Sequence, residues 1–237
     1  MNKLETKTLE LPDIKIAYCE HGSGPNLILL HGNSESKSIF KQYQNVSFKE
    51  FHSYALDSRG HGQSVSDDKK YTIGQYSNDV IRFCQALGIE KALVVGYSDG
   101  GNIALFLALN APNVFERIAA ISPNTLVSGT MPDSLILFKR IYKIFAFLKK
   151  IGIDTQKAMM RFELMLNDIG LANEDLGRIK TSVRILYAEK DMIKEDHIVE
   201  IHQNIPGSSI KKISGCTHLN ILNQEETIKE IQNYFAG

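Results

Sequence analysis

The sequence predicts an α/β protein with a mostly parallel, eight-stranded sheet, helices on both faces and a small helical cap. First, short apolar, β-branched runs alternate with helical patterns along most of the 237 residues. Second, this alternation pauses over residues 125–180 and then resumes. Third, a glycine-flanked serine falls between a strand pattern and a helix pattern. We therefore expect one core domain, residues 1–124 and 181–237, with a cap, residues 125–180, inserted in it.

The first strands are predicted by extended apolar runs near the N-terminus. Leu4 to Leu11 and Ile14 to Glu20 form an antiparallel pair joined at the turn Pro12-Asp13. Leu27 to Leu30 follows as a short, continuous apolar run, and Ser53 to Leu56 is the next strand. Such runs are typical of strands that are buried on both faces of a sheet.

The rest of the core repeats strand and helix. Thr72 to Leu87 is a helix, with Thr72 as its N-cap and Gly88 as its stop. The remaining expected elements are strand Lys91 to Val95, helix Asn102 to Leu109, strands Ile118 to Ser122, Thr181 to Ala188 and Ile210 to Ile213, and a final helix to Phe235.

The segment 125–180 is too long for a simple loop and carries helical patterns. Its first helix, Leu135 to Ile151, has an apolar stripe with basic residues mostly elsewhere. The stripe comprises Leu137, Phe138, Ile141, Phe145 and Leu148. We expect this stripe to pack on the core or on a substrate pocket. A basic amphipathic helix can also lie on a membrane, but the rest of the chain supplies no second anchor.

The glycine-flanked serine is Ser98, in the motif Gly96-Tyr97-Ser98-Asp99-Gly100. A sharp strand-to-helix turn strains the backbone at the serine and crowds the positions two before and two after it. Glycine is needed at both crowded positions because it has no Cβ. The turn exposes the hydroxyl, and the following helix directs unpaired N–H groups at the site. The pattern predicts a serine nucleophile.

A serine nucleophile requires a base and a group that orients the base. Of the seven histidines, His218 is the best placed, in a small-residue loop, residues 214–218, after a strand. Asp191 directly follows the strand that ends near Ala188, so both loops should open at the same sheet edge as Ser98. We take Asp191 as the acid; nearby alternatives are Glu189, Asp196 and Asp175.

These residues resemble a known superfamily over nearly the whole chain. The order Ser98, Asp191, His218, with His31-Gly32-Asn33 after one strand and Asp57-Ser58-Arg59-Gly60-His61-Gly62 after another, resembles the α/β-hydrolase fold. The turn Gly-Tyr-Ser-Asp-Gly-Gly is similar to that of the valacyclovir-hydrolase (biphenyl-hydrolase-like) esterases, which carry an acid after the nucleophile. The cap region gives no comparable match.

The resemblance implies an oxyanion hole formed by the backbone N–H groups of Asn33 and Asp99. It also implies that the Asp99 side chain could pair with a cationic group on the substrate; the alternative is a carboxylate favoured only by the helix N-terminus. Phe138, Met159 and Met165 are further candidates for an adaptable acyl or aryl pocket. His31 is expected to hold the oxyanion loop, and Asp57, Arg59 and His61 are expected to be structural.

The expected function is cofactor-independent hydrolysis of a small ester, thioester or lactone. One alternative on the same framework is a carbon–carbon bond hydrolase or enol-lactonase, which would need a pocket for a second carboxylate or keto group. Another is a ligand receptor that retains the three residues without turnover.

Composition supports a small-molecule enzyme. The chain has 27 acidic and 27 basic residues, so no global field favours nucleic acid. Three cysteines form no even framework and no metal spacing, and we expect no metal and no cofactor. The N-terminus lacks an apolar secretory core, so we expect a cytoplasmic protein without a stable membrane anchor. Oligomeric state cannot be predicted from these features.

Overall fold

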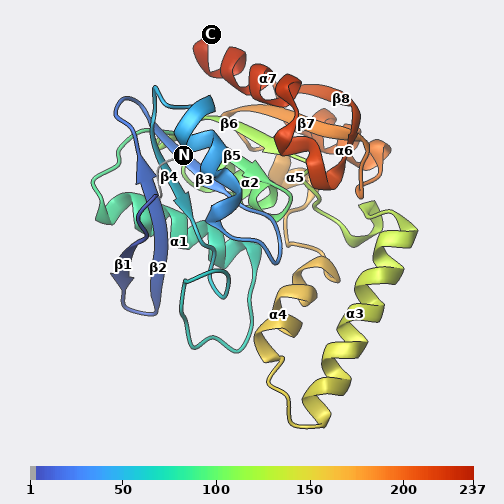
Figure 1. Cartoon of the computed structure of the whole chain (residues 1–237). Coiled ribbons are helices and arrows are strands. Elements are labelled where there is room, and N and C mark those ends of the chain that lie inside the picture. The colour runs from blue at the N-terminus through green and yellow to red at the C-terminus, as the bar shows by residue number, and fades with distance from the viewer. Residues whose placement is uncertain (1–3) are drawn as a thin grey trace.

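Eight strands form a single sheet in the order β1-β2-β4-β3-β5-β6-β7-β8 in the computed structural model, which describes residues 4–237 (Figure 1). The strands are β1 (Lys7–Leu11), β2 (Ile14–His21), β3 (Asn26–Leu30), β4 (His52–Leu56), β5 (Ala92–Tyr97), β6 (Phe115–Ile121), β7 (Ser182–Lys190) and β8 (Ser209–Thr217). β1 pairs with β2 and β2 with β4 in antiparallel fashion, and all other neighbours are parallel. The predicted mostly parallel, eight-stranded sheet is confirmed.

From β4 onwards, helices alternate with the strands, apart from three consecutive helices between β6 and β7. The helices are α1 (Ile73–Ala86), α2 (Asp99–Asn110), α3 (Pro132–Lys150), α4 (Gln156–Met165), α5 (Asn173–Leu176), α6 (Glu195–Asn204) and α7 (Glu225–Ala236). Short 3₁₀ or π-helical turns are η1 (Lys37–Phe40), η2 (Tyr43–Ser47), η3 (Val127–Gly129) and η4 (His218–Asn223). The hydroxyl of Thr72 caps α1 by accepting the backbone N–H of Gln75 at 3.1 Å, as expected.

Both faces of the sheet are covered, because successive strand residues point to opposite sides. In β3, Ile28 and Leu30 join a core cluster with apolar residues of α1, α2, α5 and α6, whereas Leu27 and Leu29 join a second cluster with residues of η1, η2, η4 and α7. This two-sided burial explains why the central strands read as continuous apolar runs.

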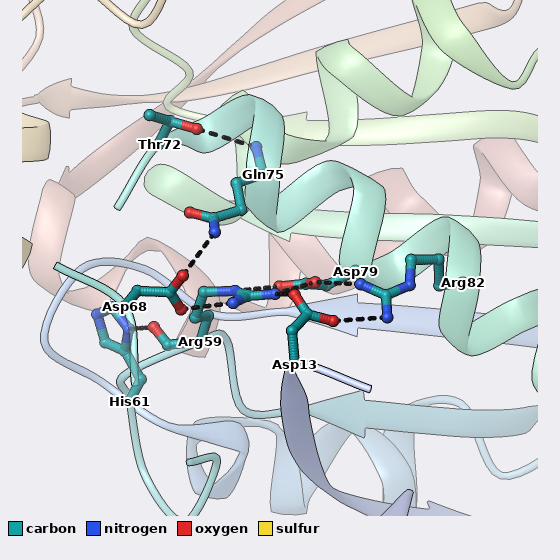
Figure 2. A network of polar contacts seen from close by, with 8 residues as sticks. All are labelled: Asp13, Arg59, His61, Asp68, Thr72, Gln75, Asp79 and Arg82. Atoms are coloured by element: carbon teal, nitrogen blue, oxygen red, sulfur yellow. Dashed lines mark hydrogen bonds and ion pairs between the residues drawn. The ribbon is translucent and has the colours of Figure 1, made fainter. Parts of the chain in front are cut away.

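A buried arginine joins the N-terminal hairpin to α1 (Figure 2). Arg59 is 1% exposed, and its guanidinium donates to both carboxylate oxygens of Asp79, at 2.9 and 2.7 Å. It also bonds Asp13, at 2.8 Å, and Asp68. Arg82 donates to the other oxygen of Asp13 at 2.6 Å. The buried charge is therefore neutralised from three sides, which agrees with the structural role expected for Arg59.

One expectation about the last strand is wrong. Residues 214–217 were predicted to form a loop, but they continue β8, which ends at Thr217 directly before His218. The pairing with β7 is irregular here, and Thr217 lies opposite Lys190. Gly215 adopts a φ of +69°, which accommodates the irregularity.

The helices α3 and α4 form a hairpin between β6 and β7 that projects from the body of the molecule (Figure 1). The two helices contact each other through aromatic rings: Phe162 of α4 lies 5.4 Å from Phe145 and 6.4 Å from Phe138, measured between ring centroids. No residue of α3 is fully buried, and Leu137 of the expected inward stripe is 50% exposed. The stripe therefore packs mainly on α4, and a substantial apolar surface is left uncovered. Among the described helices, none is both long enough and apolar enough to cross a membrane.

Candidate active site

Ser98 lies between β5 and α2 in a strained turn. Its φ and ψ are 54° and −117°, a conformation that is unfavourable for a residue with a side chain. A Cβ at Gly96 would lie 2.1 Å from the carbonyl oxygen of Gly100, and a Cβ at Gly100 would lie 2.0 Å from that of Leu30. Only glycine fits at these positions, so the sequence motif is explained by close backbone contacts.

The structure brings Ser98, His218 and Asp191 together in one hydrogen-bonded chain. The Nε2 atom of His218 lies 3.1 Å from Oγ of Ser98, and its Nδ1 lies 2.6 Å from Oδ1 of Asp191. Each residue follows the C-terminal end of a parallel strand: β5, β8 and β7 respectively. The alternative acid Glu189 instead accepts the backbone N–H of Gly215 at 2.7 Å.

Asp191 is held as a carboxylate by its neighbours. Burial alone would raise its pKa, but the hydrogen bond and charge of His218 and the hydroxyl of Ser122 outweigh burial, so that the pKa is lowered. The Ser122 hydroxyl donates to Oδ2 at 2.6 Å, and the N–H of Ala188 donates to the same oxygen at 3.0 Å. Ser122 was not recognised as a site residue in the sequence. Its only signal was a small polar residue at the end of the strand next to β5.

The loop after β3 is fixed by His31. The pKa of this fully enclosed imidazole is lowered mainly by burial, so that the ring is neutral. Its Nδ1 bonds the carbonyl oxygen of Gly32 at 2.7 Å, and its Nε2 accepts the N–H of Ser58 at 3.0 Å. These contacts agree with the expected role of His31 in holding the loop that carries Asn33.

The two residues predicted to form the oxyanion hole are linked through their side chains. The amide nitrogen of Asn33 donates to Oδ2 of Asp99 at 2.9 Å and to the carbonyl oxygen of Arg161, on α4, at 2.8 Å. Burial raises the pKa of Asp99 to about 6, against the opposing effects of the Asn33 amide, the charge of His218 and the Asn102 amide. Within residues 4–237, the backbone N–H groups of Asn33 and Asp99 have no protein acceptor.

A cavity of about 220 Å³ lies against the Ser98 hydroxyl. Of the predicted pocket residues, Asp99, Phe138 and Met165 line it. Met159 does not; α4 instead presents Phe162 to the cavity. The choice of Met159 was therefore wrong, because helical spacing alone does not determine which side of α4 faces the site.

Glu35 is a second carboxyl group in the cavity lining that sequence reasoning missed. It accepts the backbone N–H of Gly32 at 3.0 Å. Burial raises its pKa, against that hydrogen bond and the charge of His218. Among the described residues, the cavity lining contains neither lysine nor arginine. No group of three potential metal ligands is present in residues 4–237.

A family model described as alpha/beta hydrolase fold matches residues 25–149, more than half of the chain. Among curated relatives, the sn-1-specific diacylglycerol lipase ABHD11 of Xenopus laevis is 36% identical over 124 residues, which cover 50% of this chain and 39% of that protein. The chain spans less than half the length of the curated relatives it matches.

Solved structures show the same fold at low sequence identity. E-2-(Acetamidomethylene)succinate hydrolase superposes with a TM-score of 0.83 at 19% identity, over 99% of this chain and 100% of that one. The enol-lactonase from Burkholderia xenovorans LB400 superposes with a TM-score of 0.77 at 18% identity, over 98% of this chain and 100% of that one. At these identities the likeness establishes the fold alone.

Proposed function

This chain belongs to the α/β-hydrolase fold family, and from that premise we propose that it is a serine hydrolase cleaving a small carboxylic ester, thioester or lactone. The observation that carries the proposal is the hydrogen-bonded chain from Ser98 through His218 to Asp191 at the wall of a cavity. A strained, cavity-facing serine with a histidine at 3.1 Å has the arrangement that nucleophilic catalysis requires.

In the proposed reaction, Oγ of Ser98 attacks the substrate carbonyl carbon while Nε2 of His218 accepts the hydroxyl proton. His218 then donates that proton to the leaving alcohol, thiol or ring oxygen, and the acyl group remains on Ser98. Water then attacks the acyl carbonyl carbon while Nε2 of His218 accepts its proton, and His218 returns this proton to Oγ of Ser98 as the bond to the acyl group breaks and the acid leaves. The lowered pKa of Asp191 keeps it ionised, so that it orients the ring and stabilises the imidazolium that forms.

The negative charge on the carbonyl oxygen would be held by the backbone N–H groups of Asn33 and Asp99. Both groups lack a protein acceptor among the described residues, and Asp99 begins the 12-residue helix α2, whose dipole favours an anion at this end. One such donor contributes about 3–4 kcal/mol to stabilising the transition state in comparable sites. The Asn33–Asp99 side-chain bond supports the proposal, because it holds the two donors in fixed positions.

The charge of the cavity distinguishes between substrates. Its lining combines apolar side chains such as Phe138, Phe162 and Met165 with the carboxyl groups of Asp99 and Glu35. With no lysine or arginine in the lining, a substrate carrying a second carboxylate would be repelled. This counts against the alternatives that need a site for a second carboxylate, and it favours neutral or cationic acyl groups. A cationic group would pair best with ionised Asp99.

We also propose that residues 125–180 act as a cap that determines substrate choice. The supporting observation is that Phe138 of α3 and Phe162 and Met165 of α4 reach the cavity lined by Ser98. We retain the prediction of a reducing, cytoplasmic location: Cys19, Cys84 and Cys216 are all buried free thiols.

A fluorophosphonate probe, followed by a panel of p-nitrophenyl esters of varied length and charge, tests the proposal. Labelling should occur on Ser98 and disappear in Ser98→Ala, and hydrolysis should fall at least a thousandfold in Ser98→Ala and His218→Ala. Ser34→Ala is the matched control, because Ser34 also lines the cavity but does not contact His218. No labelling of the folded wild-type protein would instead support the receptor alternative.

A further inference from the structure

The hairpin carries most of the exposed large apolar side chains of the described chain. Ten large apolar side chains are exposed in residues 4–237, and six of them lie within eighteen consecutive positions of α3 and the turn after it. We call these six the α3 outer face: Ile136, Leu137, Ile144, Phe147, Ile151 and Ile153. Their exposed fractions run from 48% to 61%, so these side chains are open to solvent.

The α3 outer face is a ridge. The 19 residues of α3 extend over roughly 28 Å at the helical rise. The opposite side of α3 is taken up by α4, through the ring contacts of Phe162 and a hydrogen bond from Tyr142 to Glu163 at 2.9 Å. The hairpin projects from the body (Figure 1), so that no other element of the described chain covers this side.

The same helix concentrates positive charge, although the net charge of the whole chain is zero. Five basic side chains lie on α3, against a single acid, Asp133. The five are Lys139, Arg140, Lys143, Lys149 and Lys150. None of them forms a salt bridge within residues 4–237. Their aliphatic stems can extend along apolar surface while the charged ends reach a polar boundary.

We propose that the α3 outer face docks reversibly on the surface of a membrane that contains anionic lipid. Such a surface accepts both features, because the apolar side chains enter the headgroup–acyl boundary and the cations pair with lipid phosphates and carboxylates. A second copy of the chain is disfavoured as the occupant, since two copies would bring identical sets of five cations together. A purely acidic partner would leave the apolar side chains uncovered.

The test is co-sedimentation of the full chain with vesicles of phosphatidylcholine, with and without phosphatidylserine. We expect binding to the anionic vesicles and a loss of binding at roughly 0.5 M salt. The double variant Ile144→Gln/Phe147→Gln should lower the partition coefficient about tenfold or more. Replacing Lys139, Arg140 and Lys143 with glutamine should lower it about fivefold per charge.

The matched control is Val46→Gln/Val65→Gln, because these side chains are 58% and 51% exposed but belong to η2 and to the segment paired with Lys15 of β2, not to α3. It should bind vesicles like the wild type. Ser98→Ala should also bind normally, so that docking is tested independently of the proposed hydrolase activity. Thermal unfolding of each variant establishes that it is folded.

Three outcomes would overturn the proposal. In the first, folded wild-type protein fails to bind anionic vesicles at low salt. In the second, the apolar double variant binds as well as the wild type, which would indicate a purely electrostatic site for an acidic macromolecule. In the third, analytical ultracentrifugation finds a dimer that the double variant abolishes and that does not bind vesicles, which would make the ridge a self-association surface.

Discussion

Replacing Asp99 with asparagine measures how strongly the cavity penalises a charge next to the nucleophile. The residue is 8% exposed, and burial raises its pKa to about 6 in spite of the hydrogen bonds it accepts from Asn33 and Asn102. An aspartate in the unfolded chain has a pKa of about 3.9. The folded protein therefore binds this proton more tightly than the unfolded chain does.

The sign of the effect follows from this difference. Since the folded state holds more protons at this site, the contribution of Asp99 to the free energy of unfolding is greatest at low pH and falls as pH rises towards and through about 6. Between about pH 5 and about pH 8 the loss corresponds to about one pKa unit, or about 1.4 kcal/mol. The Asp99→Asn variant has no ionisable group at this position, so its free energy of unfolding does not include this loss.

Urea denaturation of both proteins from pH 5 to pH 8 provides the measurement, since most other titrating groups cancel in the difference. The free energy of unfolding of the wild type minus that of the variant should decrease by about 1.4 kcal/mol over this range. Asp133→Asn is the control, because Asp133 also lies in the first turn of a helix but is exposed. A difference for Asp99→Asn that stays constant with pH would refute the reasoning.

Three further changes test separate parts of the architecture. Ser122→Ala removes a hydrogen bond to Asp191, so kcat/KM for an ester should fall about ten- to a hundredfold, with the fold intact by circular dichroism; full activity would contradict the positioning role. Gly96→Ala places a Cβ 2.1 Å from a backbone oxygen, and we expect a much lower melting temperature or insoluble protein; a stable, active variant would count against the packing argument. Arg59→Met leaves buried Asp79 with only Arg82, at 3.8 Å, as a cationic neighbour and should cost about 3–5 kcal/mol in urea denaturation, whereas Lys229→Met, at an exposed pair, should cost less than about 1 kcal/mol.

The strand and helix order could be predicted because local periodicity is strong in a sheet buried on both faces. Helix α1 and its Thr72 cap, for example, depend on residues within a few positions of each other. The end of β8 could not be predicted, since Gly215 is a loop signal in isolation and its strand conformation depends on pairing with β7. Element ends are for this reason harder to predict from sequence than the presence of the elements themselves.

Within the site, the positions of Ser98, Asp191 and His218 after the ends of predicted strands were sufficient to predict that they meet at one sheet edge. Ser122 was missed because a serine at the end of a strand is common, and only its contact with Asp191 in the folded chain, at 2.6 Å, gives it a role. Likewise, the apolar stripe of α3 was visible as a periodicity, but the pattern carries no information on which neighbour covers it. Phe138 of this stripe lines the cavity, but Leu137 is half exposed, although we expected the stripe to pack on the core or on a substrate pocket.

The α3–α4 hairpin is inserted at a point in the chain where it could be replaced without disturbing Ser98, Asp191 and His218. The hairpin lies between β6 and β7, and its base is closed by a hydrogen bond from the backbone N–H of Ile169 to the carbonyl oxygen of Thr125, at 3.2 Å. Its two ends are thus held side by side, and lengthening such a segment adds only slowly to the entropy cost of closing it. Ser98 lies before the insertion, and Asp191 and His218 lie after it. Replacement hairpins from other sequences could therefore be exchanged at this point by recombination, changing what the cavity admits while the spacing of the three residues stays the same.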